Sequence, residues 1–271
     1  MSEAAGRWAA RGWDCHVHVF DASVPVLAGH YRPLSRPLHQ IEAEAGRLGV
    51  RHLVLVQPSV YGTDNGLLLR ALNVEPGRHR GVVVIADDTT DAALDAMHAA
   101  GVRGARLNRV SPVGESVDVA ARFHQLAPRL QARGWHLQWY ARPDQLAQLA
   151  ALHTGPGPTC VLDHLAGLHA GVGDGHPAWD ALASLAARGA WVKLSGWYRL
   201  GAAEPYEELL PIIRRVAALF GERLVWGSDW PHTSFAPDRQ PRYASTWQPV
   251  VGALGAARAA ALRDGMPALY R

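Results

Sequence analysis

Short runs of apolar and β-branched residues recur along the chain at nearly regular spacing, and each is followed by a segment with apolar residues at helical period. This alternation is typical of parallel βαβ units. It predicts eight strands, at residues 13–19, 52–57, 81–86, 102–107, 135–140, 159–163, 190–194 and 223–227. The helical period between them is clearest at residues 91–100, 118–133 and 206–220.

Eight parallel strands favour a closed barrel, because closure removes both edges of the sheet and uses this number naturally. The chain length of 271 residues is also close to the roughly 250 that one such barrel needs. We therefore predict an α/β fold, a single (β/α)8 TIM barrel domain over residues 1–271, with an open doubly wound sheet as the alternative. Residues 21–37 contain three prolines and no strong periodicity, which predicts a loop over the barrel mouth.

Composition narrows the class of protein. No apolar stretch approaches the roughly 20 residues that span a bilayer, and residues 1–12 lack the apolar core of a signal peptide. Two cysteines without pair spacing, Cys15 and Cys160, suit a reducing compartment. We expect a cytoplasmic protein. The net charge is +3 and the basic residues are scattered, which favours a small anionic substrate over nucleic acid or a membrane and leaves the oligomeric state open.

Two histidines, His16 and His18, lie two residues apart at the end of the first predicted strand. Side chains at this spacing leave the same face of a strand. Chance pairing is common, but barrel enzymes carry their catalytic groups at the C-terminal ends of strands. His164 directly follows the sixth predicted strand, and Asp229 follows the eighth. These four residues are therefore the predicted catalytic set.

This arrangement resembles the amidohydrolase superfamily, whose pattern is HxH on the first strand, a later strand-end histidine and an aspartate after the last strand. Residues 57–65, 103–108 and 192–199 resemble the narrower 2-pyrone-4,6-dicarboxylate lactonase branch. The resemblance implies a hydrolase that opens a cyclic ester in the catabolism of aromatic compounds. It also implies that Asp229 accepts a proton from water, as a general base, while histidines and arginines polarise the carbonyl.

Further residues are expected to contact the substrate from the rim or from the loop over it, and they are Tyr31, Ser59, Arg106, Tyr140 and Arg199. Tyr61 and Asn108 hold similar positions, but we expect them to pack. Arginines inside a barrel mouth need an anion, and a guanidinium grips a carboxylate through two parallel hydrogen bonds. A small carboxylated lactone is therefore the predicted substrate, held by the two arginines from opposite sides.

Two departures from the lactonase pattern make the pyrone dicarboxylate itself a poor expectation. Residues 165–167, Leu-Ala-Gly, stand where that branch usually has an arginine after the strand-end histidine. Beyond Arg106, only Arg109 is available as the second basic residue of its strand end. A smaller or less charged acid is expected.

Three histidines and one aspartate are also suitable ligands for one Zn²⁺. Arg106 and Tyr140 occupy the strand ends where a second ion would need ligands, so two metals are not expected. The resemblance implies a lactonase that works without a divalent ion, and we expect no cofactor. The alternative is a mononuclear zinc-dependent amidohydrolase or decarboxylase acting on a small carboxylic acid, its ion held by His16, His18, His164 and Asp229. A non-enzymatic barrel is disfavoured because none of these four residues is lost.

Lys193, the only lysine of the chain, falls inside the seventh predicted strand. A buried ammonium group needs a counter-charge. Asp14 lies two residues before His16 on the first strand, so strand parity would turn its side chain into the barrel. We therefore predict a structural ion pair between Lys193 and Asp14, with a Schiff-base role, which would require the lysine to reach the rim, as the alternative.

Overall fold

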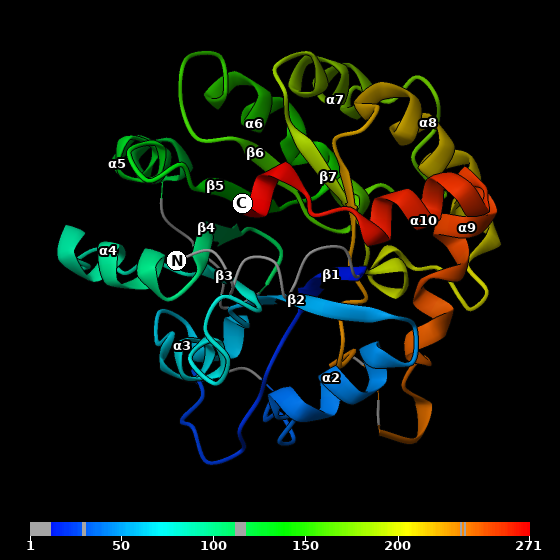
Figure 1. Cartoon of the computed structure of the whole chain (residues 1–271). Coiled ribbons are helices and arrows are strands. Elements are labelled where there is room, and N and C mark those ends of the chain that lie inside the picture. Colours follow the sequence, from blue (N-terminus) through cyan, green and yellow to red (C-terminus); the bar gives the residue numbers. More distant parts are fainter. Residues whose placement is uncertain (1–11, 29–30, 112–117, 234, 236) are drawn as a thin grey trace.

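A computed structural model describes residues 12–28, 31–111, 118–233, 235 and 237–271, and it contains one sheet in which each strand pairs in parallel with the next (Figure 1). The strands are β1 (Gly12–Val17), β2 (Val50–Val56), β3 (Arg80–Val83), β4 (Val102–Asn108), β5 (His136–Tyr140), β6 (Cys160–Leu162), β7 (Trp191–Leu194) and β8 (Leu224–Trp226). All eight predicted strands are present.

The sheet closes between its first and last strands, at their C-terminal ends. Val17 and Trp230 form a parallel bridge. The His18 amide donates to the Trp230 carbonyl at 2.9 Å, and the Asp229 amide donates to the His16 carbonyl at 2.8 Å. The predicted (β/α)8 barrel is therefore confirmed and the open sheet is excluded. The same backbone hydrogen bonds join the two chain segments that carry the candidate residues.

Helices surround the strands (Figure 1). They are α2 (Leu38–Gly46), α3 (Gly66–Leu72), α4 (Asp91–Ala99), α5 (Val119–Gln131), α6 (Leu146–Leu152), α7 (Ala178–Ala187), α8 (Leu210–Phe220), α9 (Gln248–Leu254) and α10 (Ala256–Asp264). The Asp118 carboxylate caps α5 by accepting from the amides of Ala120 and Ala121. The helix predicted at 206–220 begins later, because a 3₁₀ turn at Glu207–Leu209 precedes α8. In the described part of the chain, no helix has the length and apolar character needed to cross a membrane.

The lower part of the barrel interior is packed with apolar side chains. They are Trp13, Cys15, Val54, Val56, Val82, Val225 and Tyr270. Tyr270, close to the C-terminus, is fully buried among them. A filled interior leaves the C-terminal mouth of the barrel as the place for a site, as in barrel enzymes generally. That residues 1–271 form one domain stays a prediction.

Candidate active site

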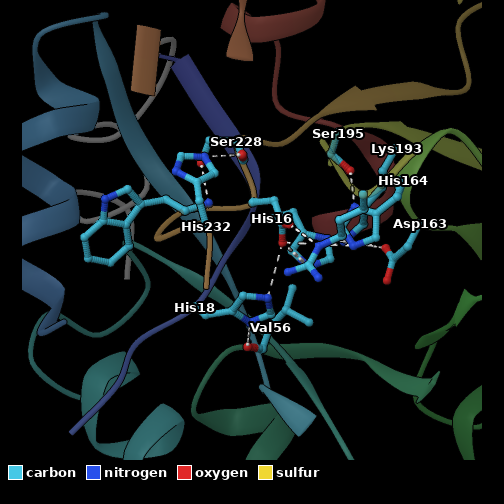
Figure 2. A network of polar contacts seen from close by, with 12 residues as sticks. His16, His18, Val56, Asp163, His164, Lys193, Ser195, Ser228 and His232 are labelled. Carbon is cyan, nitrogen blue, oxygen red and sulfur yellow. Dashed lines mark hydrogen bonds and ion pairs between the residues drawn. The ribbon is translucent and has the colours of Figure 1, made fainter. Parts of the chain in front are cut away.

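The four residues predicted as catalytic meet at one point above the packed interior. The Oδ1 atom of Asp229 lies 3.4 Å from His18 Nε2, 3.7 Å from His16 Nε2 and 4.0 Å from His164 Nε2. All four side chains are buried. Figure 2 shows the three imidazoles approaching one another from different parts of the rim.

Two glycines make room for these imidazoles. Gly227, which follows β8, lies so close to β1 that a Cβ atom there would be 2.5 Å from the Cβ of His16. Gly196, after β7, has φ +64°, and a Cβ there would be 2.3 Å from His164 Nδ1. Both distances are far below van der Waals contact. The close approach therefore requires glycine at both positions.

The outer nitrogens of the imidazoles decide which tautomers are possible. His18 Nδ1 lies 2.7 Å from the Val56 carbonyl oxygen, which can only accept, so in the neutral ring Nδ1 carries the hydrogen (Figure 2). His16 Nδ1 faces the carboxylate of Asp163 at 3.4 Å, an ion-pair distance without a hydrogen bond, and a neighbouring carboxylate favours a hydrogen on that nitrogen. Both rings then present an Nε2 lone pair to the centre. His164 Nδ1 lies 3.0 Å from the Ser195 hydroxyl, which can donate or accept, so His164 can present an Nε2–H.

The Asp229 carboxylate has two different environments. Its Oδ2 accepts hydrogen bonds from the Tyr198 hydroxyl at 2.6 Å and from Arg199 Nε at 2.5 Å. Among the described residues, no hydrogen bond reaches Oδ1. Burial alone would raise the pKa of Asp229, but Arg199, His164 and His18 hold it well below its ordinary value. The group is therefore an anion whose free oxygen faces the imidazoles.

Sequence reasoning missed Tyr198, and it predicted for Arg199 a contact with the substrate but no contact with Asp229. Arg199 does line the cavity, but its Nε is engaged with Asp229. Tyr198 shares the same carboxylate oxygen. Both lie in the segment 192–199 that carried the family resemblance, yet nothing in the local pattern distinguishes Tyr198 from a packing aromatic.

A cavity of about 390 Å³ opens above the four residues. Its lining is His18, Tyr31, Pro58, Ser59, Arg106, Asn108, Val110, Ser111, Tyr140, His164, Arg199 and Thr233. The five residues expected to contact substrate are all in this wall. Tyr61 lies outside this lining and donates its hydroxyl to the Asp21 carbonyl at 2.9 Å. Arg109 lies outside the lining and donates to the Gln148 side chain at 2.7 Å.

Arg106 is the cation that the cavity leaves without a counter-charge. Its side chain is 4% exposed, and its Nη2 donates to the Gln57 carbonyl at 2.5 Å. Its Nε has no hydrogen-bond partner, and no carboxylate lies within ion-pair distance of its guanidinium, among the residues that the structure describes. Burial lowers the pKa of Arg106, but an arginine stays protonated in proteins. The wall therefore offers a buried positive charge to a bound anion.

Lys193 does not pair with Asp14, so that prediction is wrong. Its Nζ lies 3.6 Å from Asp163 Oδ1. The Asp14 carboxylate instead accepts from the Ser228 amide and the Tyr243 hydroxyl, each at 2.9 Å. The register of β1 against β2 shifts between Asp14 and Val17, and this irregularity interrupts the strict alternation on which the prediction depended.

Burial also shifts the titration of several histidines, which predicts a loss of stability in mild acid. The pKa of His136 is lowered to about 3, and those of His153, His164 and His232 to about 4. Because the unfolded chain protonates its histidines near pH 6.5, it binds more protons than the folded chain between about pH 4 and that value.

The free energy of unfolding should therefore fall by on the order of 5 kcal/mol between about pH 7 and about pH 5. Asp14 acts the other way, since burial raises its pKa to about 6, but it is one group against four. Urea unfolding followed by circular dichroism across this range measures the slope. A stability that is constant or rises toward acid would show that these histidines are not held neutral.

The donor set fits one divalent cation. One nitrogen each of His16 and His18 and one oxygen of Asp229 all lie within 4.8 Å of one another. Their separations of 3.4 and 3.7 Å from Asp229 Oδ1 are long for hydrogen bonds and close to the roughly 3.3 Å between neighbouring ligands of a tetrahedral Zn²⁺. Lone pairs of two imidazoles that face a carboxylate oxygen also favour a cation, or the hydrogens of a water molecule, between them.

Comparison with known proteins agrees with this architecture. The chain is 28% identical over 235 residues to a 4-sulfomuconolactone hydrolase of Rhizobium radiobacter, covering 84% of this chain and 79% of that protein. It is 30% identical over 239 residues to a 2-pyrone-4,6-dicarboxylate hydrolase of Comamonas testosteroni, covering 81% and 76%. A crystal structure of a Pseudomonas putida protein proposed to be a 2-pyrone-4,6-dicarboxylic acid hydrolase is 33% identical, covers 97% of both chains and superposes with a TM-score of 0.83.

Residues 13–260, nearly the whole chain, match the amidohydrolase family. The match includes both chain segments that meet at the closure of the barrel, and with it all four candidate catalytic residues. The resemblance drawn from the sequence is thereby confirmed, and so is the expectation of a hydrolase. The chain belongs to the amidohydrolase family.

Proposed function

We propose that this protein hydrolyses a small lactone that bears at least one carboxylate. The observation that carries the proposal is the buried guanidinium of Arg106, which has no counter-charge among the described residues and lies in the wall of a cavity above Asp229 and three imidazoles. The names of the two relatives, both hydrolases of acidic ring compounds, support the same reaction class.

In the proposed reaction, a water molecule lies between Asp229 Oδ1 and the Nε2 lone pairs of His16 and His18. Its oxygen attacks the lactone carbonyl carbon while Asp229 accepts a proton as general base. His164, presenting Nε2–H, would stabilise the oxyanion by donating to it. The ring C–O bond then breaks, and the leaving oxygen recovers the proton.

The donors of the wall favour a compact acid. Arg106 can bind a carboxylate through its Nε, which has no partner among the described residues, and Asn108 and Ser59 are hydrogen-bonded to each other beside it at 2.8 Å. The remaining N–H groups of Arg199 would approach the same ligand from the neighbouring wall, because its Nε is already held by Asp229. Residues 165–167, Leu-Ala-Gly, which stand where this branch usually has an arginine, add no charge. We therefore propose a monocarboxylated lactone as the preferred substrate.

Hydrolysis without a resident ion is the version that we propose. Arg106, Arg199 and Lys193 bring three cations to this end of the barrel, against the carboxylates of Asp163 and Asp229, and a divalent ion would add to an existing positive excess. The alternative is one Zn²⁺ held by His16, His18 and Asp229, where it would supply Lewis-acid activation of water or carbonyl. Metal content of the purified protein, measured beside its turnover, separates the two versions.

A panel of lactones tests the function directly. We expect a monocarboxylated lactone to be opened with a kcat/KM at least about tenfold above that of an uncharged lactone of equal shape, the least that one charge-assisted hydrogen bond contributes. Titration of the released acid measures both rates. Release of CO₂ from small carboxylic acids, with no lactone opened, would instead favour the decarboxylase alternative. A cytoplasmic location stays a prediction.

A further inference from the structure

Below the candidate site, a buried polar network connects Lys193 to His16. Lys193 lies on β7, Asp163 follows β6, His16 lies on β1, and Gln138 on β5 completes the set. All four side chains are fully buried. Figure 2 shows Asp163 with His16 and Lys193 beside it, on the side of His16 away from His18.

Lys193 determines which atoms of this network donate hydrogen bonds and which accept them. An ammonium group only donates. Its Nζ donates to Gln138 Oε1 at 2.6 Å and to the Cys15 carbonyl at 2.9 Å. The amide of Gln138 must therefore turn its Nε2 toward Asp163, where it donates to Oδ2 at 2.8 Å.

Oδ2 of Asp163 therefore accepts a hydrogen bond, whereas Oδ1 accepts none among the described residues and faces two nitrogens at ion-pair distance. Its Oδ1 lies 3.6 Å from Lys193 Nζ and 3.4 Å from His16 Nδ1. A fully buried carboxylate is stable only when its charge is compensated, and Lys193 supplies the opposite charge. With Asp163 ionised and able only to accept, the hydrogen of the neutral His16 ring belongs on Nδ1.

We propose that Lys193 and Asp163 are positioning residues that hold His16 as the Nδ1–H tautomer, so that its Nε2 lone pair faces Asp229 and the reacting water. This inference rests on the hydrolysis proposed above. Neither residue touches the substrate, since neither lines the cavity. They act through His16 alone, as a buried carboxylate that orients a catalytic imidazole does in other enzymes.

The near-isosteric substitution Asp163→Asn should place a hydrogen-bond donor opposite His16 Nδ1, where the parent has an acceptor. An amide has one accepting end and one donating end, whereas the Asp163 carboxylate accepts from Gln138 at Oδ2 and turns Oδ1 toward Lys193 Nζ and His16 Nδ1. If the amide oxygen faces Gln138, the amide nitrogen faces His16 Nδ1 and forces the hydrogen onto Nε2. Lys193→Met should also shift the hydrogen of His16 to Nε2, because it removes both the charge of the lysine and the hydrogen bond that orients the Gln138 amide.

The tautomer can be read by ¹⁵N NMR of the His16 side chain in the protein as purified, without any substrate. We expect the parent to show a protonated Nδ1 and an unprotonated Nε2, and both variants to show a protonated Nε2 in a substantial population. Lactone turnover should fall roughly 10²–10⁴-fold in kcat with little change in KM. Tyr270→Phe is the matched control, because it removes a buried hydroxyl that has no hydrogen-bond partner among the described residues, and it should change neither readout.

An unchanged His16 tautomer in folded Asp163→Asn protein overturns the inference, whatever happens to turnover. If Lys193→Met does not fold, Asp163→Asn still decides. If the parent opens no lactone, the proposed function fails while the NMR result stands by itself, so the two failures are distinguishable.

Discussion

Replacing Asp229 with asparagine should reduce turnover by roughly 10²–10⁴-fold while leaving the fold intact, because it removes a positioned base at nearly constant shape. The structure determines how the new amide must lie. Tyr198 and Arg199 both donate to Oδ2, so the amide oxygen stays there. The amide nitrogen then takes the place of Oδ1 and presents hydrogens where the reacting water needs an acceptor.

Steady-state rates with the best lactone of the panel, together with circular dichroism, measure the effect. Asp180→Asn on the exposed side of α7 is the matched control, since it makes the same chemical change outside the cavity lining. Near-parental turnover in folded Asp229→Asn protein would rule out Asp229 as the base. The role would then have to pass to one of the imidazoles.

Arg106→Met should weaken binding of a carboxylated lactone by about 1.5–3 kcal/mol, the range for a hydrogen bond to a charged group. An uncharged lactone of equal shape should be little affected. The reason is that Arg106 is buried in the cavity wall with a free Nε and no counter-charge among the described residues. Methionine keeps much of the length of the side chain and removes its charge.

Inhibition constants for the two lactones, compared between parent and variant, give the difference. Arg109→Met provides the control: it removes a neighbouring arginine on the same strand end whose guanidinium contacts Gln148 outside the cavity lining. Equal losses for both ligands would mean that Arg106 acts on the reacting carbonyl or on the fold. The carboxylate role would then be wrong.

The elements of the barrel were predictable because their signals are local. Apolar runs of strand length, separated by segments of helical period, placed all eight strands to within three residues of their observed ends. Eight parallel strands in one closed ring put every strand's C-terminal end on one rim. The meeting of His16, His18, His164 and Asp229 at that rim therefore followed from their positions after the strands, although their roles stay predictions.

The partners of buried charges could not be predicted in the same way. Parity along a strand says which face a side chain leaves, but the register of β1 shifts between Asp14 and Val17, and Asp14 faces Tyr243 instead of Lys193. Asp163, which does compensate Lys193, looked in the sequence like an ordinary residue before the strand-end histidine. The stagger between strands decides such pairs, and no local pattern records it.

The sequence by itself determined the fold, the family and the place of the candidate site, because these depend on periodicity and on the order of residues along each strand. Only the tertiary structure decided how the charges are distributed among Arg106, Arg199 and Lys193. Arg199 and Lys193 each have a carboxylate within ion-pair distance, and Arg106 has none among the described residues. The physical reason is that a buried charge is compensated by whichever opposite charge the packed barrel brings within a few ångströms, and that distance is a property of the whole fold.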